Sequence, residues 1–237
     1  MKRSETLKRL IFVIELIVLS ACAAPAIPTH RAMPEKIGVP HFVDSAPNNS
    51  DVFAVAPPRV VVNFDGALGD ASALTVTRDG APLALGALTF GQHKISMAVA
   101  LPHAAGDGAY VVKFKACQSD GSCPEGQFAF TVDSKIKNLY ADFTGKRAIT
   151  IRMKEIKFAP ATIVVSTGTT ITWLNDDAVD HFVNSDPHPS HNALPALNSL
   201  ALKPGEQYSF TFDQPGEWAY HCSAHVPAQM IGRVIVK

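Results

Sequence analysis

Three residues near the C-terminus, Cys222, His225 and Met230, carry side chains that bind copper and follow the spacing C-x2-H-x4-M. One loop therefore offers a thiolate, an imidazole and a thioether. A blue-copper centre takes two imidazoles and one thiolate in a trigonal plane with a weak axial thioether, so a second histidine must come from elsewhere. His181 follows an alternating strand and a polar turn, which would present it at a strand end. These four residues predict a copper centre that carries single electrons.

The sequence lacks the features of catalytic copper centres. A dinuclear centre would need a second cysteine in the ligand loop, where position 226 is Val, and no H-x-H pair for a catalytic copper occurs in the chain. A four-coordinate copper with a methionine ligand has no open position, whereas catalytic metals keep one. We therefore expect an electron carrier or copper-binding protein and not an enzyme.

The elements that must position these ligands are strands, because apolar residues alternate with polar ones and no stretch keeps a helical repeat for long. In the C-terminal part the alternating or apolar runs cover residues 149–153, 163–165, 170–174, 208–212, 218–220 and 234–236.

Residues 148–237 resemble a cupredoxin, with a ligand-loop spacing similar to that of plastocyanin. The residues that carry the resemblance are Phe158, Pro160, Gly168, Trp173, Asn175, Asp176, His181, Pro215, Gly216, Tyr220, Cys222, His225, Met230 and Gly232. The resemblance implies a Greek-key β-sandwich with one type 1 copper at one end. It also implies that His181, Cys222 and His225 are equatorial ligands and that Met230 is axial.

Two positions depart from the plastocyanin pattern. Phe182 stands where many relatives carry an Asn that ties the two ligand loops together, so the tuning of the ligands is expected to differ. Asp180 stands where relatives often have Pro, which would place a carboxylate near the exposed copper edge where partners dock.

Short alternating runs also occupy residues 41–133, and their spacing predicts a second small β-sandwich. Its opening (residues 41–64) and its close (residues 120–130) resemble the CopC family of copper-resistance proteins, which implies an Ig-type sandwich. That family holds Cu(II) partly through an N-terminal His and a later His, and neither is present at the matching positions. We interpret the domain as a spacer or docking module, with copper binding by His41, His93 and His103 as the alternative. The predicted fold class is all-β, with two β-sandwich domains.

The N-terminus resembles a bacterial lipoprotein. Residues 1–21 read as a signal peptide with a short apolar region, and Leu19, Ser20, Ala21 and Cys22 resemble a lipobox. We expect cleavage before Cys22, lipid attachment to its sulfur and an Ala/Pro-rich tether over residues 22–40. Ala23 favours the outer membrane of a Gram-negative host, so the predicted location is the periplasm-facing side of that membrane. An ordinary signal peptide is the alternative.

Cys117 and Cys123 flank a five-residue loop and are predicted to form a disulfide in an oxidising compartment. Metal binding or free thiols are the alternatives, since pairing cannot be derived from spacing alone.

Three further histidines lie near the predicted ligands. His188 and His191 form an H-x2-H pair in a proline-containing loop, which could be an auxiliary metal site but is more typical of solvated loop residues. His221 should point away from the Cys222 side chain along the strand, which predicts exposure rather than ligation.

Equal numbers of basic and acidic residues, 21 each, give no net charge and no argument for a nucleic-acid partner. Residues 134–147 form the predicted interdomain linker, and Leu139, Tyr140 and Phe143 indicate that it packs. The whole pattern predicts an envelope-anchored copper protein that transfers electrons with a redox partner in the periplasm or membrane. The alternatives are copper homeostasis, or copper delivery as an accessory subunit of a membrane oxidase or reductase.

Overall fold

Strands and short 3-10 helices make up the regular structure of the computed structural model, which describes residues 39–102 and 105–237. The predicted signal peptide, Cys22 and nearly all of the tether lie outside these residues. Within the described ranges, no helix has the length and apolar character needed to cross a bilayer. The all-β fold class with two sandwich domains is confirmed.

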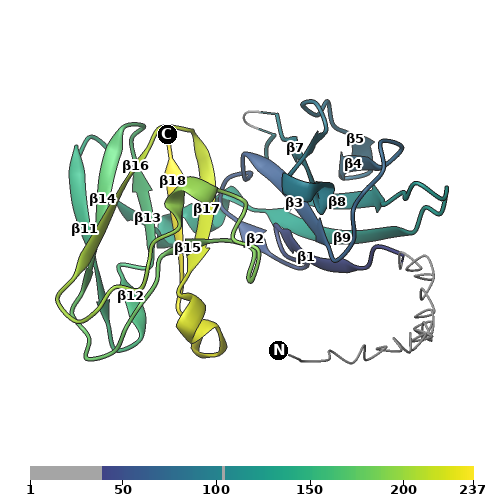
Figure 1. The fold of residues 1–237 in the computed structure, drawn as a ribbon. Coiled ribbons are helices and arrows are strands. Elements are labelled where there is room, and N and C mark those ends of the chain that lie inside the picture. The colour runs from purple at the N-terminus through teal and green to yellow at the C-terminus, as the bar shows by residue number, and fades with distance from the viewer. Residues whose placement is uncertain (1–38, 103–104) are drawn as a thin grey trace, which may run out of the picture. The chain divides into compact units, whose positions relative to one another are not determined.

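The N-terminal sandwich packs a four-stranded sheet of order β1-β3-β7-β6 against a five-stranded sheet of order β2-β9-β8-β4-β5 (Figure 1). Alternate residues of β8 and β9 point into the core, among them Tyr110, Val112, Phe128 and Phe130. The elements are β1 (Phe42–Ala46), β2 (Val52–Phe53), β3 (Arg59–Phe64), β4 (Ala73–Arg78), β5 (Ala81–Pro82), β6 (Thr89–Phe90), η1 (Gln92–Lys94), β7 (Ser96–Ala100), β8 (Gly108–Lys115) and β9 (Glu125–Val132).

Cys117 and Cys123 form a disulfide that closes the loop between β8 and β9. The Gln118 N–H donates to the Ser122 carbonyl oxygen at 2.8 Å inside this loop. The structure thus contains the predicted disulfide, rather than a metal site or free thiols at these two cysteines.

The C-terminal sandwich has one sheet of order β12-β11-β14-β16 and a second of order β10-β13-β18-β17-β15. In β14 every second residue is buried, and Ile171 and Trp173 face the core between the sheets. The elements are β10 (Ala141–Asp142), β11 (Ala148–Lys154), β12 (Lys157–Ala159), β13 (Thr162–Val165), β14 (Thr169–Asn175), β15 (Asn184–Ser185), η3 (Pro195–Leu197), β16 (Gln207–Phe212), β17 (Gly216–His221), η4 (Ser223–Ala228) and β18 (Ile231–Val236).

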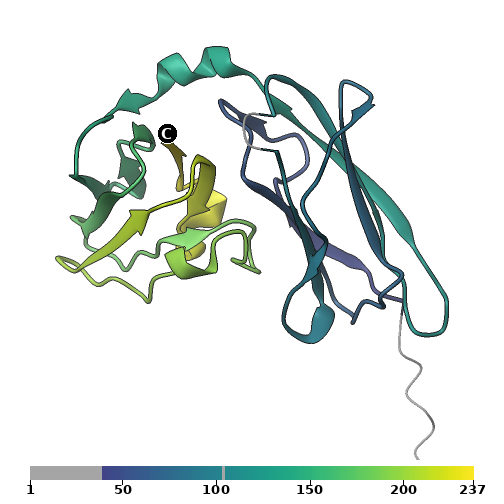
Figure 2. The ribbon, with the colours of Figure 1, turned by 90° about the horizontal axis from the view of Figure 1, so that it is seen from above.

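The segment between the sandwiches forms η2 (Ser134–Leu139), the coiled ribbon that follows β9 in Figure 2. The Tyr140 hydroxyl donates to Glu217 Oε1 at 2.6 Å, and Phe143 packs against the C-terminal core, whereas Leu139 is exposed. Glu217 Oε2 accepts the backbone N–H groups of Ala54 and Val55 at 2.6 and 2.9 Å. Burial raises the pKa of the Glu217 carboxyl, and these hydrogen bonds oppose that shift. Two of the three predicted packing residues therefore hold the linker in place.

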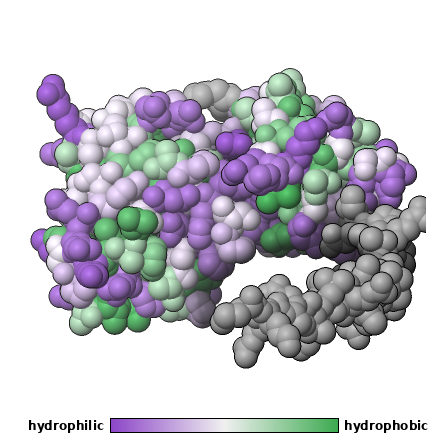
Figure 3. All heavy atoms as spheres, in the orientation of Figure 1, coloured by the Kyte–Doolittle hydropathy of each residue, from purple (hydrophilic) through white to green (hydrophobic). Residues whose placement is uncertain are grey.

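Large exposed hydrophobic residues are spread over both sandwiches, with Leu139 and Leu200 the most exposed of those described. On the face drawn in Figure 3, hydrophobic residues form small patches among hydrophilic ones. Scattered apolar residues of this kind are normal for a protein surface and indicate no docking site by themselves.

Candidate copper site and a second histidine cluster

The predicted copper ligands come from two loops at one end of the C-terminal sandwich. His181 follows β14 and pairs with Leu202 through two backbone hydrogen bonds of 3.0 and 2.8 Å. Cys222 directly follows β17, His225 lies in η4, and Met230 immediately precedes β18. The strands fix where the two loops begin and end, and so bring His181 and Cys222, which are 41 positions apart, to the same place.

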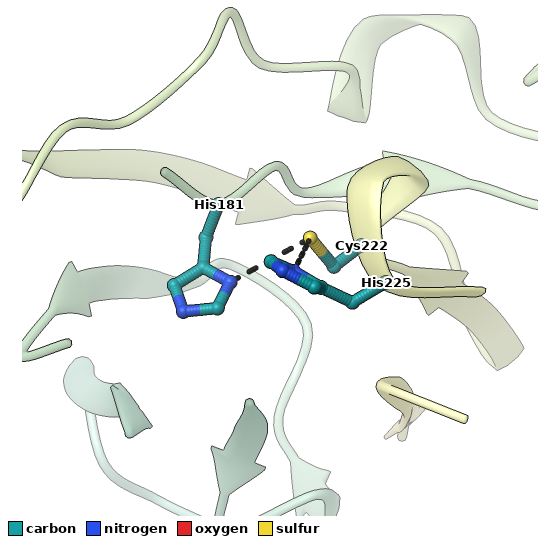
Figure 4. Close-up of side chains that lie close together, drawn as sticks. All are labelled: His181, Cys222 and His225. Carbon is teal, nitrogen blue, oxygen red and sulfur yellow. Dashed lines mark hydrogen bonds between the residues drawn. The ribbon is translucent and has the colours of Figure 1, made fainter. Parts of the chain in front are cut away.

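Three of the four predicted ligands converge on one point, as Figure 4 shows. The Cys222 Sγ lies 3.7 Å from His181 Nδ1 and 3.3 Å from His225 Nδ1. An ion bound about 2.0 Å from nitrogen and about 2.3 Å from sulfur at a trigonal angle would separate these atoms by about 3.7 Å. Cys222 and His181 are fully buried and His225 is half-buried. The two imidazoles and the thiol therefore fit the equatorial set of a type 1 copper.

The ligand loop returns on itself, which brings Met230 to the same end. The Cys222 N–H donates to the Met230 carbonyl oxygen at 2.9 Å, and the His225 N–H donates to the Cys222 carbonyl oxygen at 2.9 Å. Gln229 adopts a left-handed conformation that ends η4 and lets the chain enter β18. Met230 is 1% exposed and packs in the same apolar cluster as Cys222.

A carboxylate orients the His181 ring. His181 Nε2 lies 3.1 Å from Asp177 Oδ2, so a proton on Nε2 leaves the lone pair of Nδ1 directed at Cys222. The Ile156 N–H donates to the same oxygen at 2.8 Å, and this bond is the main cause that lowers the pKa of Asp177. Asp177 is thus held as a carboxylate that fixes the ring.

The two ligand loops are tied together although position 182 is Phe. The Phe182 backbone N–H donates to the Cys222 Sγ at 3.3 Å, and the Ser223 hydroxyl donates to Asn184 Oδ1 at 2.8 Å. Sequence reasoning missed Asn184, although its amide stands two residues after Phe182. It also missed the role of Asn175, a buried residue whose Nδ2 donates to the carbonyl oxygens of Val179 and Leu202. Asp180 is exposed beside the first ligand loop.

A second cluster of His188, His191 and His221 lies beside the first, and we call it the three-histidine cluster. The expectation that His221 is exposed was wrong: its side chain points away from Cys222 but is 3% exposed, because the loop of residues 186–192 contacts it. His188 is exposed and His191 half-buried. Burial, together with the neighbouring His221 and His188, lowers the pKa of His191.

The histidines of the N-terminal sandwich do not assemble in the part of the chain that the structure describes. His41 Nδ1 lies 3.0 Å from Asp65 Oδ2, and His93 is exposed on η1. Neither belongs to a described group of three metal-binding side chains, and His103 lies outside the described residues.

Each of the two sandwich domains matches a known protein family. Residues 146–237 match the copper binding proteins of the plastocyanin/azurin family, and residues 42–133 match the CopC domain. The protein is therefore a CopC domain followed by a plastocyanin/azurin-type cupredoxin domain.

Two plastocyanins agree with the cupredoxin assignment. The plastocyanin of Prochlorothrix hollandica is 32% identical over 95 residues, which are 38% of this chain and 72% of that protein. The chloroplastic plastocyanin of Tetradesmus obliquus is 38% identical over 88 residues, which are 34% of this chain and 58% of that protein. The chain thus spans little more than half the length of the Tetradesmus relative. The solved structure of CopC from Methylosinus trichosporium OB3b is 31% identical and covers 40% of this chain and 93% of its own, with a TM-score of 0.36. Through its C-terminal domain the chain belongs to the plastocyanin/azurin family.

Proposed function

We propose that the C-terminal domain holds one type 1 copper through His181, Cys222, His225 and Met230 and transfers single electrons. The observation that carries this proposal is the convergence of two imidazole nitrogens and one buried thiol at distances that fit a trigonal ion. Bound copper would supply the chemistry by alternating between Cu(II) and Cu(I).

The surrounding residues support electron transfer by holding the ligands still. Asp177 fixes the His181 ring, the Phe182 N–H donates to the Cys222 sulfur, and the Asn184–Ser223 bond ties the two loops. Ligands that cannot move between oxidation states add little reorganisation energy to electron transfer. His225 is only half-buried, which gives the site an edge near solvent for a redox partner.

We further propose that the protein acts at the bacterial envelope and exchanges electrons with a periplasmic or membrane redox partner. The lipobox-like sequence that ends at Cys22 supports lipid anchoring, and Ala23 supports an outer-membrane location. Two of the relatives named above are plastocyanins, which agrees with an electron carrier rather than an enzyme.

The test is to load the purified protein with Cu(II) and record its visible absorption and EPR spectra. We expect an intense blue thiolate charge-transfer band with narrow copper hyperfine splitting. Cys222→Ser should abolish both, while Met230→Leu should keep the band and raise the reduction potential. If the unsubstituted protein gave no blue band and only a tetragonal copper signal that is unchanged by Cys222→Ser, the electron-transfer proposal would be refuted.

Copper delivery is a second candidate function, favoured by the CopC domain and by the three-histidine cluster. A donor must release Cu(I), whereas an electron carrier must retain copper in both redox states. Reducing the loaded protein beside a chromogenic Cu(I) chelator separates the two. Prompt, complete transfer to the chelator indicates delivery, and retention through repeated redox cycles indicates electron transfer.

A further inference from the structure

We propose that the three-histidine cluster is a second metal site, which binds Cu(II) and, more weakly, Zn(II). His191 Nε2 lies 3.1 Å from His221 Nε2 and 3.3 Å from His188 Nδ1, and the ligand atoms of all three lie within 4.8 Å of one another. Nitrogens bound about 2.0–2.1 Å from one ion at tetrahedral angles would lie about 3.3 Å apart. The cluster has the dimensions of a metal site.

Hydrogen bonds alone cannot give every ring nitrogen in the three-histidine cluster a partner. His191 Nε2 also lies 3.0 Å from the Ser223 hydroxyl oxygen, whose proton goes to Asn184. An imidazole nitrogen carries either one proton or one lone pair. A proton on His191 Nε2 can serve one of its three neighbours, which leaves lone pairs facing one another across the cluster. One cation would satisfy all three nitrogens.

A carboxylate orients the buried histidine, as in the first site. His221 Nδ1 lies 2.7 Å from Asp186 Oδ1, so a proton held on Nδ1 leaves the Nε2 lone pair directed at His191. Metal-binding histidines commonly donate their other ring N–H to a carboxylate. The Asp186–His221 pair therefore repeats what Asp177 does for His181.

The loop of residues 186–192 is fixed at both ends before any ion binds. The Asp186 N–H donates to the Ala219 carbonyl oxygen at 3.2 Å, and the His191 N–H donates to the Pro187 carbonyl oxygen at 2.7 Å. Asn198 Nδ2 donates to the His191 carbonyl oxygen at 2.7 Å and holds that residue in a left-handed conformation. Pre-arranged ligands cost little entropy on binding, which favours a site over a chance contact.

The donor set decides which ion binds. Three imidazoles without a thiolate suit Cu(II) and Zn(II), and the order of affinities for nitrogen sites places Cu(II) above Zn(II). A three-histidine set also leaves a coordination position open, and the exposed His188 puts it next to solvent. This inference goes beyond the electron carrier proposed above, because that function needs only the thiolate site.

The experiment is a Cu(II) titration of the purified protein, followed by calorimetry and EPR. We expect two equivalents to bind, one giving the blue signal and the other a tetragonal signal with nitrogen hyperfine structure. In Cys222→Ser the tetragonal signal should remain alone, and Zn(II) should bind this variant with a stoichiometry of one.

The decisive variants are His188→Ala with His191→Ala, and separately His191→Gln. We expect both to lose the tetragonal copper and keep the blue copper, which also reports that the domain is folded. His93→Ala, which removes an exposed histidine of the N-terminal sandwich, should still bind two equivalents. A single equivalent in the unsubstituted protein, or a tetragonal signal that survives in both cluster variants, would overturn the second site. Loss of the blue signal alone would count only against the electron-carrier proposal.

Discussion

Cys222 and His221 are consecutive residues, yet their side chains enter two clusters of different chemistry. Cys222 lies among two imidazoles and the apolar core, and is fully buried. His221 lies on the opposite face of the strand, among two other imidazoles and a carboxylate, under a loop whose His188 is exposed. Strand alternation can therefore direct two consecutive residues into neighbouring clusters of opposite character, one with a soft, closed donor set and one with an open, nitrogen-only set.

The two clusters depend on the same strand, β17, so a substitution that displaces β17 should weaken metal binding at both. Gly232 pairs with Tyr220 across β17 and β18, and a Cβ at position 232 would overlap the Tyr220 ring. We expect Gly232→Ala to displace β17, to lower the free energy of unfolding by about 1–3 kcal/mol and to weaken both copper signals. Urea denaturation and EPR measure the two effects. Leu139→Ala, which changes an exposed residue of η2, is the control and should change neither. Loss of only one signal in Gly232→Ala would contradict the shared-strand explanation.

Substitution of each orienting carboxylate should weaken metal binding at one cluster and leave the other unchanged. Asp177→Asn should lower copper affinity about 10- to 100-fold at the thiolate site only, and Asp186→Asn should do the same at the three-histidine cluster only. An amide can present its NH₂ group to the ring and no longer favours the required tautomer. Competition against a chelator of known affinity, read by EPR at each signal, gives both constants. If each substitution weakened both sites equally, the carboxylates would act through the fold and not through their own histidines.

Strand alternation explains which parts of these two clusters could be predicted from the sequence. The alternating runs indicated the strands that carry the sites, and the spacing from Cys222 to Met230 indicated the donor types of the first cluster. Alternation also gave the correct direction for His221. It gave the wrong exposure, because the proline-containing loop of residues 186–192 has no periodicity from which its path over β17 could be predicted. The contribution of Asn184 was missed for the same reason, since its partner Ser223 is 39 residues away.

A positive charge bound in the three-histidine cluster should change the reduction potential of copper in the thiolate site. With Zn(II) in the three-histidine cluster, the added positive charge near Cys222 favours Cu(I) over Cu(II), so the reduction potential of the blue copper should rise by roughly a few tens of millivolts. Potentiometry with and without Zn(II) measures this shift, and it should shrink as the salt concentration increases. His188→Ala with His191→Ala is the control and should show no response to Zn(II). A shift of equal size in that variant would place the zinc elsewhere.

The smallest expected effect concerns Ser223, whose hydroxyl lies between the clusters. Its oxygen lies 3.0 Å from His191 Nε2, and it donates to Asn184 at 2.8 Å. Ser223→Ala removes the hydrogen bond to Asn184 that holds η4 beside the cluster, so we expect roughly threefold weaker copper binding at the three-histidine cluster, consistent with the loss of that one bond. The blue signal should persist, because the Phe182 N–H bond to the Cys222 sulfur still joins the two ligand loops.

The matched control for Ser223→Ala is Ser209→Ala, which removes an exposed hydroxyl that contacts Thr172 on the outer face of β16. It should leave copper binding at both clusters unchanged. A blue band that shifts in Ser223→Ala without any change at the three-histidine cluster would show that the Asn184–Ser223 bond serves the thiolate site. The hydroxyl would then belong to the first cluster, and the boundary between the two would run between Ser223 and His191.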